Sequence, residues 1–214
     1  MIRLHDYELS ADAFKVRQLL AWLGLAHEKI LVDVHPGREH ESARFRSELS
    51  PLGRVPVLED DGLRLHDAGA ILVYLAARHD EARRWLPVDA RAQGAVAQWL
   101  GIAHDLSRSA GALRLHHAFG AAVDVAVCRG EAIALLRLLD DQLAERASAG
   151  ERWLVAAQPT IADLACFPHA ALAGEGGLAL DAWPALRRWL WDLRHLPGFI
   201  GMPGILAAGE AQRI

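Results

Sequence analysis

The chain has little cysteine and no pair of cysteines at redox or metal-binding spacing. Only Cys128 and Cys166 occur among its 214 residues, and they lie far apart in the sequence. A disulfide framework is therefore not expected, and a reducing cytoplasm is the expected location. The histidines show no partner at metal-ligand spacing, so no metal site is predicted.

The sequence also lacks a long apolar run and an excess of positive charge. No stretch of about 18 apolar residues indicates a membrane span, and the N-terminus shows no signal-peptide pattern. The formal net charge is -4 and the sequence pI about 6.2. This charge offers no general attraction for nucleic acid or for an anionic membrane, so neither is expected as a partner.

The first 80 residues alternate short apolar runs with helical patterns. The predicted elements are a strand at 1–7, a helix at 11–24, a strand at 29–34, a helix at 41–49, a hairpin at 55–66 and a helix at 67–78. The hairpin turns at Asp61-Gly62, and Asp67 is the expected N-cap of the last helix. This order predicts an α/β sandwich.

The second half follows a different pattern. After a polar stretch at 81–88, only helical periodicity remains, and it is broken at Gly120, Gly150 and Gly174. The Gly- and Pro-rich segment 196–205 is expected to run along the surface. An α/β domain followed by an all-helical domain is the predicted architecture.

The dipeptide Val55-Pro56 stands at the start of a predicted strand. A proline cannot donate to the sheet there. A cis bond would turn the N–H and C=O of Val55 outward, where they could pair with a peptide-like ligand. A trans proline on an edge strand is the alternative.

The stretch "PTIADL" predicts a helix N-terminus rather than a catalytic site. Thr160 and Asp163 have the spacing of a capping box, with Pro159 and Leu164 placed to form a hydrophobic staple.

Four motifs together resemble the cytosolic glutathione transferases, in particular the bacterial, serine-type members. They are "LHDYELSADAFKVRQLLAWLG", "SPLGRVPVLEDDG", "DAGAILVYLA" and "ERWLVAAQPTIADLACF", in this order. The resemblance implies the glutathione transferase fold: a thioredoxin-like domain at 1–80, a linker at 81–88 and an all-helical domain at 89–214. It also implies a cis Val55-Pro56 bond and a cytoplasmic homodimer.

The resemblance implies glutathione as co-substrate and a small hydrophobic electrophile as the second substrate. A free thiol has a pKa near 8.5, so only about 3% is ionised at pH 7 and a hydroxyl donor is needed. Ser10, at the start of the first helix, matches the serine of "LSGNCYK" in family members, and Tyr7 is the second candidate. Asp12 stands where that pattern has asparagine, and its charge would oppose a thiolate unless it points away or caps the helix.

The remaining glutathione contacts are also carried over from the family. Val55 and Pro56 would meet the cysteinyl part, and Asp67 and Ala68 the γ-glutamyl end. Ala68 replaces the family's serine, so one hydroxyl contact is lost while the backbone N–H remains. Two further residues, His40 and Arg54, are candidates for the glycine-end carboxylate, with an exposed surface position as the alternative for each.

The second substrate is expected between the two domains. Residues offered as its lining are Trp99, Ile102, Ala103, Leu106, Arg108 and Arg114, although residues at helical spacing more often form core than a pocket. Conjugation and glutathione-dependent disulfide reduction both remain open. A rival interpretation is a protein with the same fold whose degenerate site binds another ligand or a partner protein, because departures cluster at Ala11, Asp12, Ala13 and Ala68.

Overall fold

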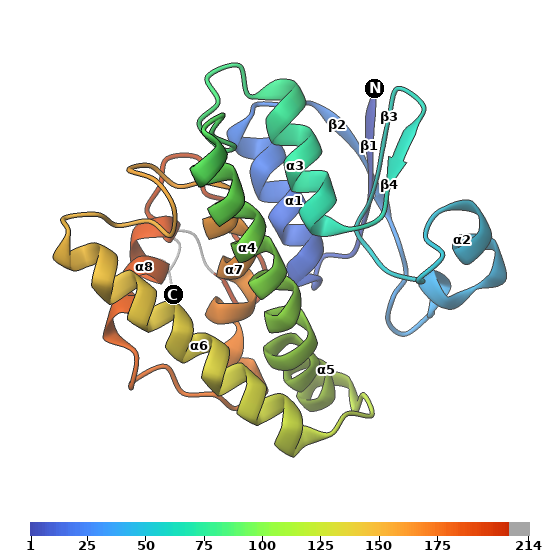
Figure 1. Ribbon diagram of the computed structural model, residues 1–214. Helices are drawn as coiled ribbons and strands as arrows, with labels where there is room; N and C mark the ends of the chain where they lie inside the picture. The colour runs from blue at the N-terminus through green and yellow to red at the C-terminus, as the bar shows by residue number, and fades with distance from the viewer. Residues whose placement is uncertain (206–214) are drawn as a thin grey trace, which may run out of the picture.

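A computed structural model describes residues 1–205 and shows a small mixed sheet followed by a helical bundle (Figure 1). The first half consists of β1 (Ile2–Asp6), α1 (Ala11–Trp22), β2 (His27–Leu31), α2 (Ala43–Glu48), β3 (Val57–Asp60), β4 (Leu63–Leu65) and α3 (Ala68–His79). The second half consists of α4 (Ala90–Leu106), a π-helical turn (Ser107–Gly111), α5 (Ala112–Phe119), α6 (Val125–Ser148), α7 (Ile161–Ala171) and α8 (Pro184–Arg194). Two 3-10 turns lie at Glu39–Glu41 and Ala173–Gly176. The predicted fold class is confirmed.

The sheet has the order β2-β1-β3-β4. Strand β1 runs parallel to β2 and antiparallel to β3, with His5 opposite Val57. Strand β4 pairs antiparallel with β3, with Leu65 opposite Leu58. The end of β1, the start of β3 and the end of β4 therefore lie at one edge of the sheet.

Strand β2 differs from the sequence prediction. It covers His27–Leu31 rather than 29–34, because the chain leaves the sheet after Leu31 and turns. Two backbone hydrogen bonds close this turn. The Val34 N–H donates to the Val32 carbonyl at 2.9 Å, and the Glu39 N–H donates to the Asp33 carbonyl at 2.8 Å.

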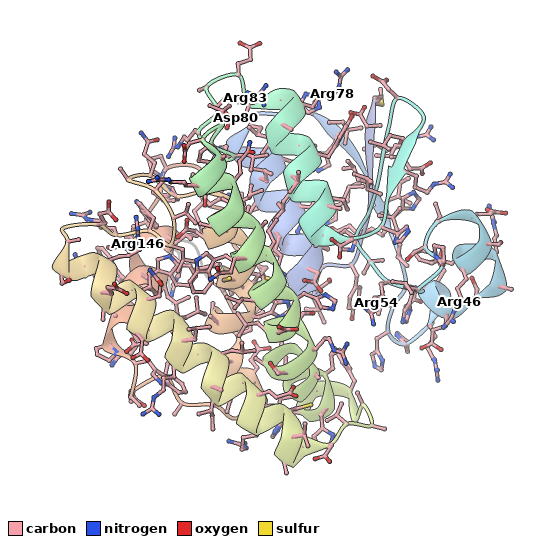
Figure 2. All side chains as sticks on the ribbon, in the orientation of Figure 1. Arg46, Arg54, Arg78, Asp80, Arg83 and Arg146 are labelled. Carbon is pink, nitrogen blue, oxygen red and sulfur yellow. The ribbon has the colours of Figure 1, made fainter. Side chains whose placement is uncertain are left out.

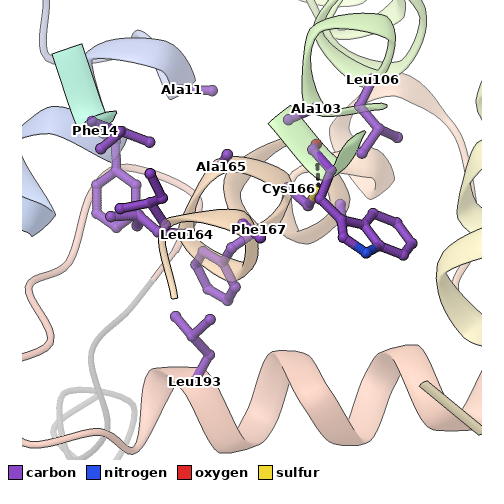
Figure 3. Packing of buried hydrophobic residues seen from close by; sticks show 14 of the residues in the cluster. Ala11, Phe14, Ala103, Leu106, Leu164, Ala165, Cys166, Phe167 and Leu193 are labelled. Atoms are coloured by element: carbon purple, nitrogen blue, oxygen red, sulfur yellow. Dashed lines mark hydrogen bonds between the residues drawn. The ribbon is translucent and has the colours of Figure 1, made fainter. Parts of the chain in front are cut away.

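Helices α1 and α3 lie side by side against the sheet (Figure 1). Their apolar residues recur with helical spacing and are fully buried: Phe14, Leu19, Leu20, Ile71, Leu72 and Leu75. The same core continues into the helical half, where Phe14, Leu164, Phe167 and Leu193 form part of one cluster (Figure 3). A smaller cluster of Val32, Phe45 and Val57 holds α2.

Helix α7 is buried over every residue from Ile161 to Ala170. It begins with the predicted capping box, because the Thr160 hydroxyl accepts from the Ala162 N–H at 3.2 Å and the Asp163 carboxylate accepts from the Thr160 N–H at 2.9 Å. Asp163 also accepts from the Leu154 N–H at 2.9 Å and from the Trp189 indole at 3.0 Å. The motif is structural, as predicted.

The segment 196–205 runs along the surface, as predicted, with Pro197, Gly201 and Pro203 exposed, but it is also fastened to the core. The Gln18 side chain donates to the Gly198 carbonyl at 3.1 Å and accepts from the Ile200 N–H at 2.8 Å. Met202 and Ile205 are buried against the core. The glycines and prolines correctly predicted irregular backbone, but they carry no information about which side chains of the segment are buried.

The segment 81–88, which joins α3 to α4, is fastened to the first half. The Trp85 ring stacks on Trp22 with centroids 4.4 Å apart. None of the helices within residues 1–205 is long and apolar enough to cross a lipid bilayer.

We predict that Asp163→Ala destabilises the protein more than Thr160→Ala. The threonine change removes one cap and should cost about 0.5–2 kcal/mol. The aspartate change leaves the N–H groups of Leu154 and Thr160 and the Trp189 indole without their acceptor, and it should cost at least about 3 kcal/mol. Urea denaturation of both variants measures the difference.

The exposed N-cap Asp89, which accepts from the Ala92 N–H at 2.9 Å, supplies the control variant Asp89→Ala. Equal losses for Asp163→Ala and Asp89→Ala would contradict this account of the α7 start.

Candidate functional site

Three segments meet at the sheet edge defined above. The end of β1 leads into Tyr7 and Ser10, the segment Val55-Pro56 precedes β3, and β4 leads into Asp67 and Ala68. Strand register thus brings together predicted site residues that are up to 61 positions apart in the sequence, from Tyr7 to Ala68. This edge is the candidate site.

Ser10 is the N-cap of α1. Its Oγ accepts from the Ala13 N–H at 3.1 Å, and its own N–H donates to the Tyr7 carbonyl at 2.9 Å. A hydroxyl that accepts in a capping bond still has its proton to donate. Ser10 can therefore cap the helix and donate to a ligand at the same time, at the positive end of the helix dipole.

Tyr7 is partly buried beside charged groups of both signs. Burial raises the pKa of Tyr7, the Asp33 carboxylate raises it further, and Arg114 opposes them. The phenol is therefore protonated at neutral pH. A raised pKa makes it a weaker hydrogen-bond donor than a phenol whose pKa is lowered.

Asp12 does not cap the helix. Its Oδ1 accepts from Lys15 Nζ at 2.6 Å and contacts His169 Nε2 at 3.1 Å, and its Oδ2 accepts from the Ser107 hydroxyl at 3.1 Å. Burial alone would raise the pKa of Asp12, but Lys15 and His169 outweigh it and hold the pKa well below its usual value. The carboxylate is ionised and turned toward the helical half.

The start of α3 combines a cap with a missing hydroxyl. Asp67 Oδ1 accepts from the Ala70 N–H at 2.8 Å, which confirms the predicted N-cap. Ala68 is the first helical residue and is only 8% exposed. The first N–H groups of a helix have no partner inside it, so this helix start offers an anion backbone donors but no side-chain hydroxyl.

The peptide bond between Val55 and Pro56 is cis, as predicted. Within residues 1–205, no hydrogen bond uses the Val55 N–H or C=O. Both groups are available to pair with an extended ligand.

His40 and Arg54 lie near this segment. Gly53, with φ of +60°, packs against the His40 carbonyl so closely that a Cβ would lie 2.8 Å from it, which places His40 beside the segment that leads to Val55. The Nδ1 of His40 is buried and has no partner in the described part of the chain. Burial lowers the pKa of His40 against the opposing effect of Glu41. Arg54 is exposed between α2 and the rest of the molecule (Figure 2).

The helical half closes against the same edge. Arg114 donates to the Leu9 carbonyl at 2.7 Å and also pairs with Glu175. The His35 ring, on the loop after β2, lies 4.4 Å from the Phe119 ring at the end of α5, centroid to centroid. The helical half therefore contacts the first half at Leu9, directly before Ser10 in the sequence, and at His35, on the loop after β2.

Three residues expected to line a second-substrate pocket are core instead. Trp99, Ala103 and Leu106 are buried members of the main hydrophobic core. Figure 3 shows Ala103 and Leu106 among the residues of this core. Ile102 is partly buried against the same core, and Arg108 is exposed. The helical spacing of these residues therefore reflects packing in the core, which was the alternative to a pocket lining.

Sequence reasoning missed Lys15, Ser107 and His169. One signal was present, because Asp12 and Lys15 have the i, i+3 spacing of a helical ion pair. The contacts from Ser107 and His169 cross the domain junction and have no sequence pattern. Within residues 1–205, no group of three or more metal-ligating side chains could hold a metal ion.

Asp12→Asn should destabilise the protein. The Lys15 side chain is only 4% exposed, so its ammonium would lose its counter-charge in a buried position. We expect the free energy of unfolding to fall by about 2–3 kcal/mol, less than for a fully buried pair because the carboxylate is partly exposed. Urea denaturation measures the loss, and the exposed pair Arg44–Glu48 supplies the control Glu48→Gln. Equal stability of both variants would contradict the role of the pair.

Stability should also depend on pH through His169. Burial and the nearby Lys15 lower the pKa of His169 below its ordinary 6.5, against Asp12. As pH falls below 6.5, His169 becomes protonated in the unfolded chain but stays neutral in the folded chain. The unfolded state is thereby favoured, and the wild type loses stability. The stability advantage of wild type over His169→Gln should therefore shrink from pH 7 to pH 5 in urea denaturation. An advantage that stays constant or grows would contradict it.

Comparison with known proteins agrees with this geometry. The glutathione S-transferase N-terminal domain profile matches residues 4–83. Glutathione S-transferase GstB of Escherichia coli is 32% identical over 207 residues, which cover 92% of this chain and 95% of that protein. Maleylacetoacetate isomerase of Pseudomonas aeruginosa is 30% identical over 203 residues, covering 87% and 88%. The structure of Ure2p in complex with glutathione superposes with a TM-score of 0.81 at 26% identity, covering 92% and 95%. The chain belongs to the glutathione S-transferase family.

Proposed function

We propose that this protein is a glutathione transferase that binds reduced glutathione along the sheet edge and joins the glutathione sulfur to a small hydrophobic electrophile. The observation that carries the proposal is the meeting at one edge of the Ser10 hydroxyl, the unpaired backbone of Val55 and the N-terminus of α3. The family relatives named for glutathione chemistry support it.

In this proposal the parts of glutathione meet different residues of the site. Val55 pairs through its backbone with the cysteinyl residue, next to Pro56. The N-terminus of α3 receives the γ-glutamyl carboxylate through the N–H of Ala68, and Asp67 faces the amino group. His40 and Arg54 receive the glycine carboxylate.

The chemistry requires a thiolate. Lowering the thiol pKa by about 2 units makes roughly three quarters of it ionised at pH 7, at a cost of about 2.7 kcal/mol. A hydrogen bond to a charged group supplies about 1.5–3 kcal/mol, and a helix N-terminus adds up to about 1. Ser10 provides both. The thiolate then attacks an electrophilic carbon, forming a C–S bond while a leaving group departs with the electron pair.

A binding protein with a degenerate site is the second candidate. Ala68 removes a hydroxyl from the γ-glutamyl contact, and Ure2p shows the same fold in a protein described as a nitrogen regulation fragment. We favour the enzyme because the Ser10 hydroxyl, the unpaired backbone of Val55 and the N-terminus of α3 meet at one edge, which supports a glutathione site. The proposal includes a homodimer in the cytoplasm.

Ser10→Ala should lower kcat/KM toward an activated aryl chloride about 10- to 100-fold, which corresponds to about 1.5–3 kcal/mol. Tyr7→Phe should change it by less than about 5-fold, because the raised pKa of Tyr7 makes the phenol a poor thiolate partner. Steady-state kinetics with glutathione decides between them. A larger loss for Tyr7→Phe would reverse the assignment.

Ala68→Ser should tighten glutathione binding about 10- to 100-fold by restoring a hydroxyl contact to the carboxylate. Isothermal titration calorimetry measures it. The exposed Ala70, two residues further along α3, supplies the control Ala70→Ser, for which no gain is expected. An unchanged affinity for Ala68→Ser would favour the degenerate-site candidate.

A further inference from the structure

The Asp12 carboxylate joins three elements that are far apart in the sequence. Lys15 lies on the same helix α1, Ser107 opens the π-helical turn between α4 and α5, and His169 lies near the end of α7. All three side chains contact this one carboxylate within 3.1 Å. The cluster is built into the domain junction, two residues from Ser10.

The cluster contains one ion pair, between Lys15 and Asp12. The side chains of Lys15 and His169 are 4% and 5% exposed, whereas that of Asp12 is 31% exposed. Burial and Lys15 lower the pKa of His169, so it contributes no charge at neutral pH and donates to Asp12 as the Nε2–H tautomer. Lys15 is thus the counter-charge of Asp12. Arg114 also acts on His169 electrostatically, but its own carboxylate partner is Glu175.

The geometry of the turn fits the imidazole. Gly111 packs against His169 so closely that a Cβ would lie 3.0 Å from Nδ1 and 3.1 Å from Cε1. The turn that carries Ser107 therefore rests on the same ring that holds Asp12. π-helical turns of this kind are often found at functional sites.

A bare carboxylate in the first turn of α1 would work against the chemistry proposed for Ser10. It would repel a thiolate bound at the helix start and cancel the positive end of the dipole. Here the carboxylate is paired with an ammonium at 2.6 Å, and both of its oxygens are held by the helical half and by Lys15. The repulsion is thereby balanced.

We propose that Lys15, His169 and Ser107 are positioning residues that act through Asp12: Lys15 balances its charge, His169 and Ser107 hold it on the helical half, and together they keep the start of α1 competent to stabilise a thiolate beside Ser10. This inference rests on the proposed function. It assigns a role in the proposed reaction to a contact between α1 and α7.

The test is the pKa of bound glutathione, read from thiolate absorbance as pH is varied. Lys15→Met leaves Asp12 unbalanced and should raise that pKa by about one unit. At pH 7, kcat should then fall about 3-fold with KM little changed, because the ionised fraction of the thiol falls from roughly three quarters to roughly one quarter. The double variant Lys15→Met/Asp12→Asn removes both charges and should return the pKa to near the wild-type value.

A purely structural role predicts otherwise. The double variant would then be as impaired as the single one, and the thiol pKa would stay constant while stability fell. Either result would overturn the charge-balance role. Arg188→Met removes an exposed arginine that pairs with Asp192 on α8, and it should change neither readout.

The positioning role has its own measurement, which needs no ligand. In His169→Phe, which removes the donor to Asp12, amide hydrogen exchange should speed up in residues 10–15 and in 107–111. His169→Gln restores a donor and should recover part of the protection. Unchanged exchange in His169→Phe would overturn the positioning role. If the wild type forms no thiolate with glutathione, the proposed function fails together with the charge-balance role, and the exchange result still decides whether the cluster holds α1.

Discussion

The architecture depends on the burial of α7 among the other helices. This helix packs against α1, α3, α4 and α8, and every residue from Ile161 to Ala170 is buried. Its polar side chains therefore have to be satisfied by neighbours, because an unpaired polar group there would be costly. Asp163 receives donors from the helical half at one end, and His169 contacts Asp12 of α1 near the other. One buried helix thus fixes the position of the helix start that carries Ser10.

The candidate site follows from sheet register and from helix ends. Antiparallel pairing brings the segment before β3 and the end of β4 to the end of β1, so the cis Val55-Pro56 bond and the start of α3 lie near Ser10. Two helix N-termini, an unpaired backbone segment and a hydroxyl are suited to a peptide-like anion that carries a thiol. Ala68 gives the start of α3 no side-chain hydroxyl but leaves its backbone donors in place.

Much of this could be predicted from the sequence because it is locally encoded. The hairpin at Asp61-Gly62, the cap at Asp67 and the capping box at Thr160 depend on residues within a few positions of one another. The cis bond at Val55-Pro56 followed from the family resemblance, which also gave the fold. The contact between Asp12 and His169 could not be predicted, since it joins residues 157 positions apart. The burial of Met202 and Ile205 and the π-helical turn at Ser107 likewise depend on tertiary packing, which no local pattern predicts.

The most direct test of the central claim is calorimetric titration of the wild type with reduced glutathione at pH 7, in two buffers of different ionisation enthalpy. The account predicts binding with a dissociation constant of millimolar or tighter. It also predicts release of roughly 0.7 of a proton per site, because about 97% of the free thiol is protonated and about three quarters of the bound thiol is ionised. Binding without proton release would contradict thiolate stabilisation by Ser10, and the absence of binding would contradict the glutathione site itself.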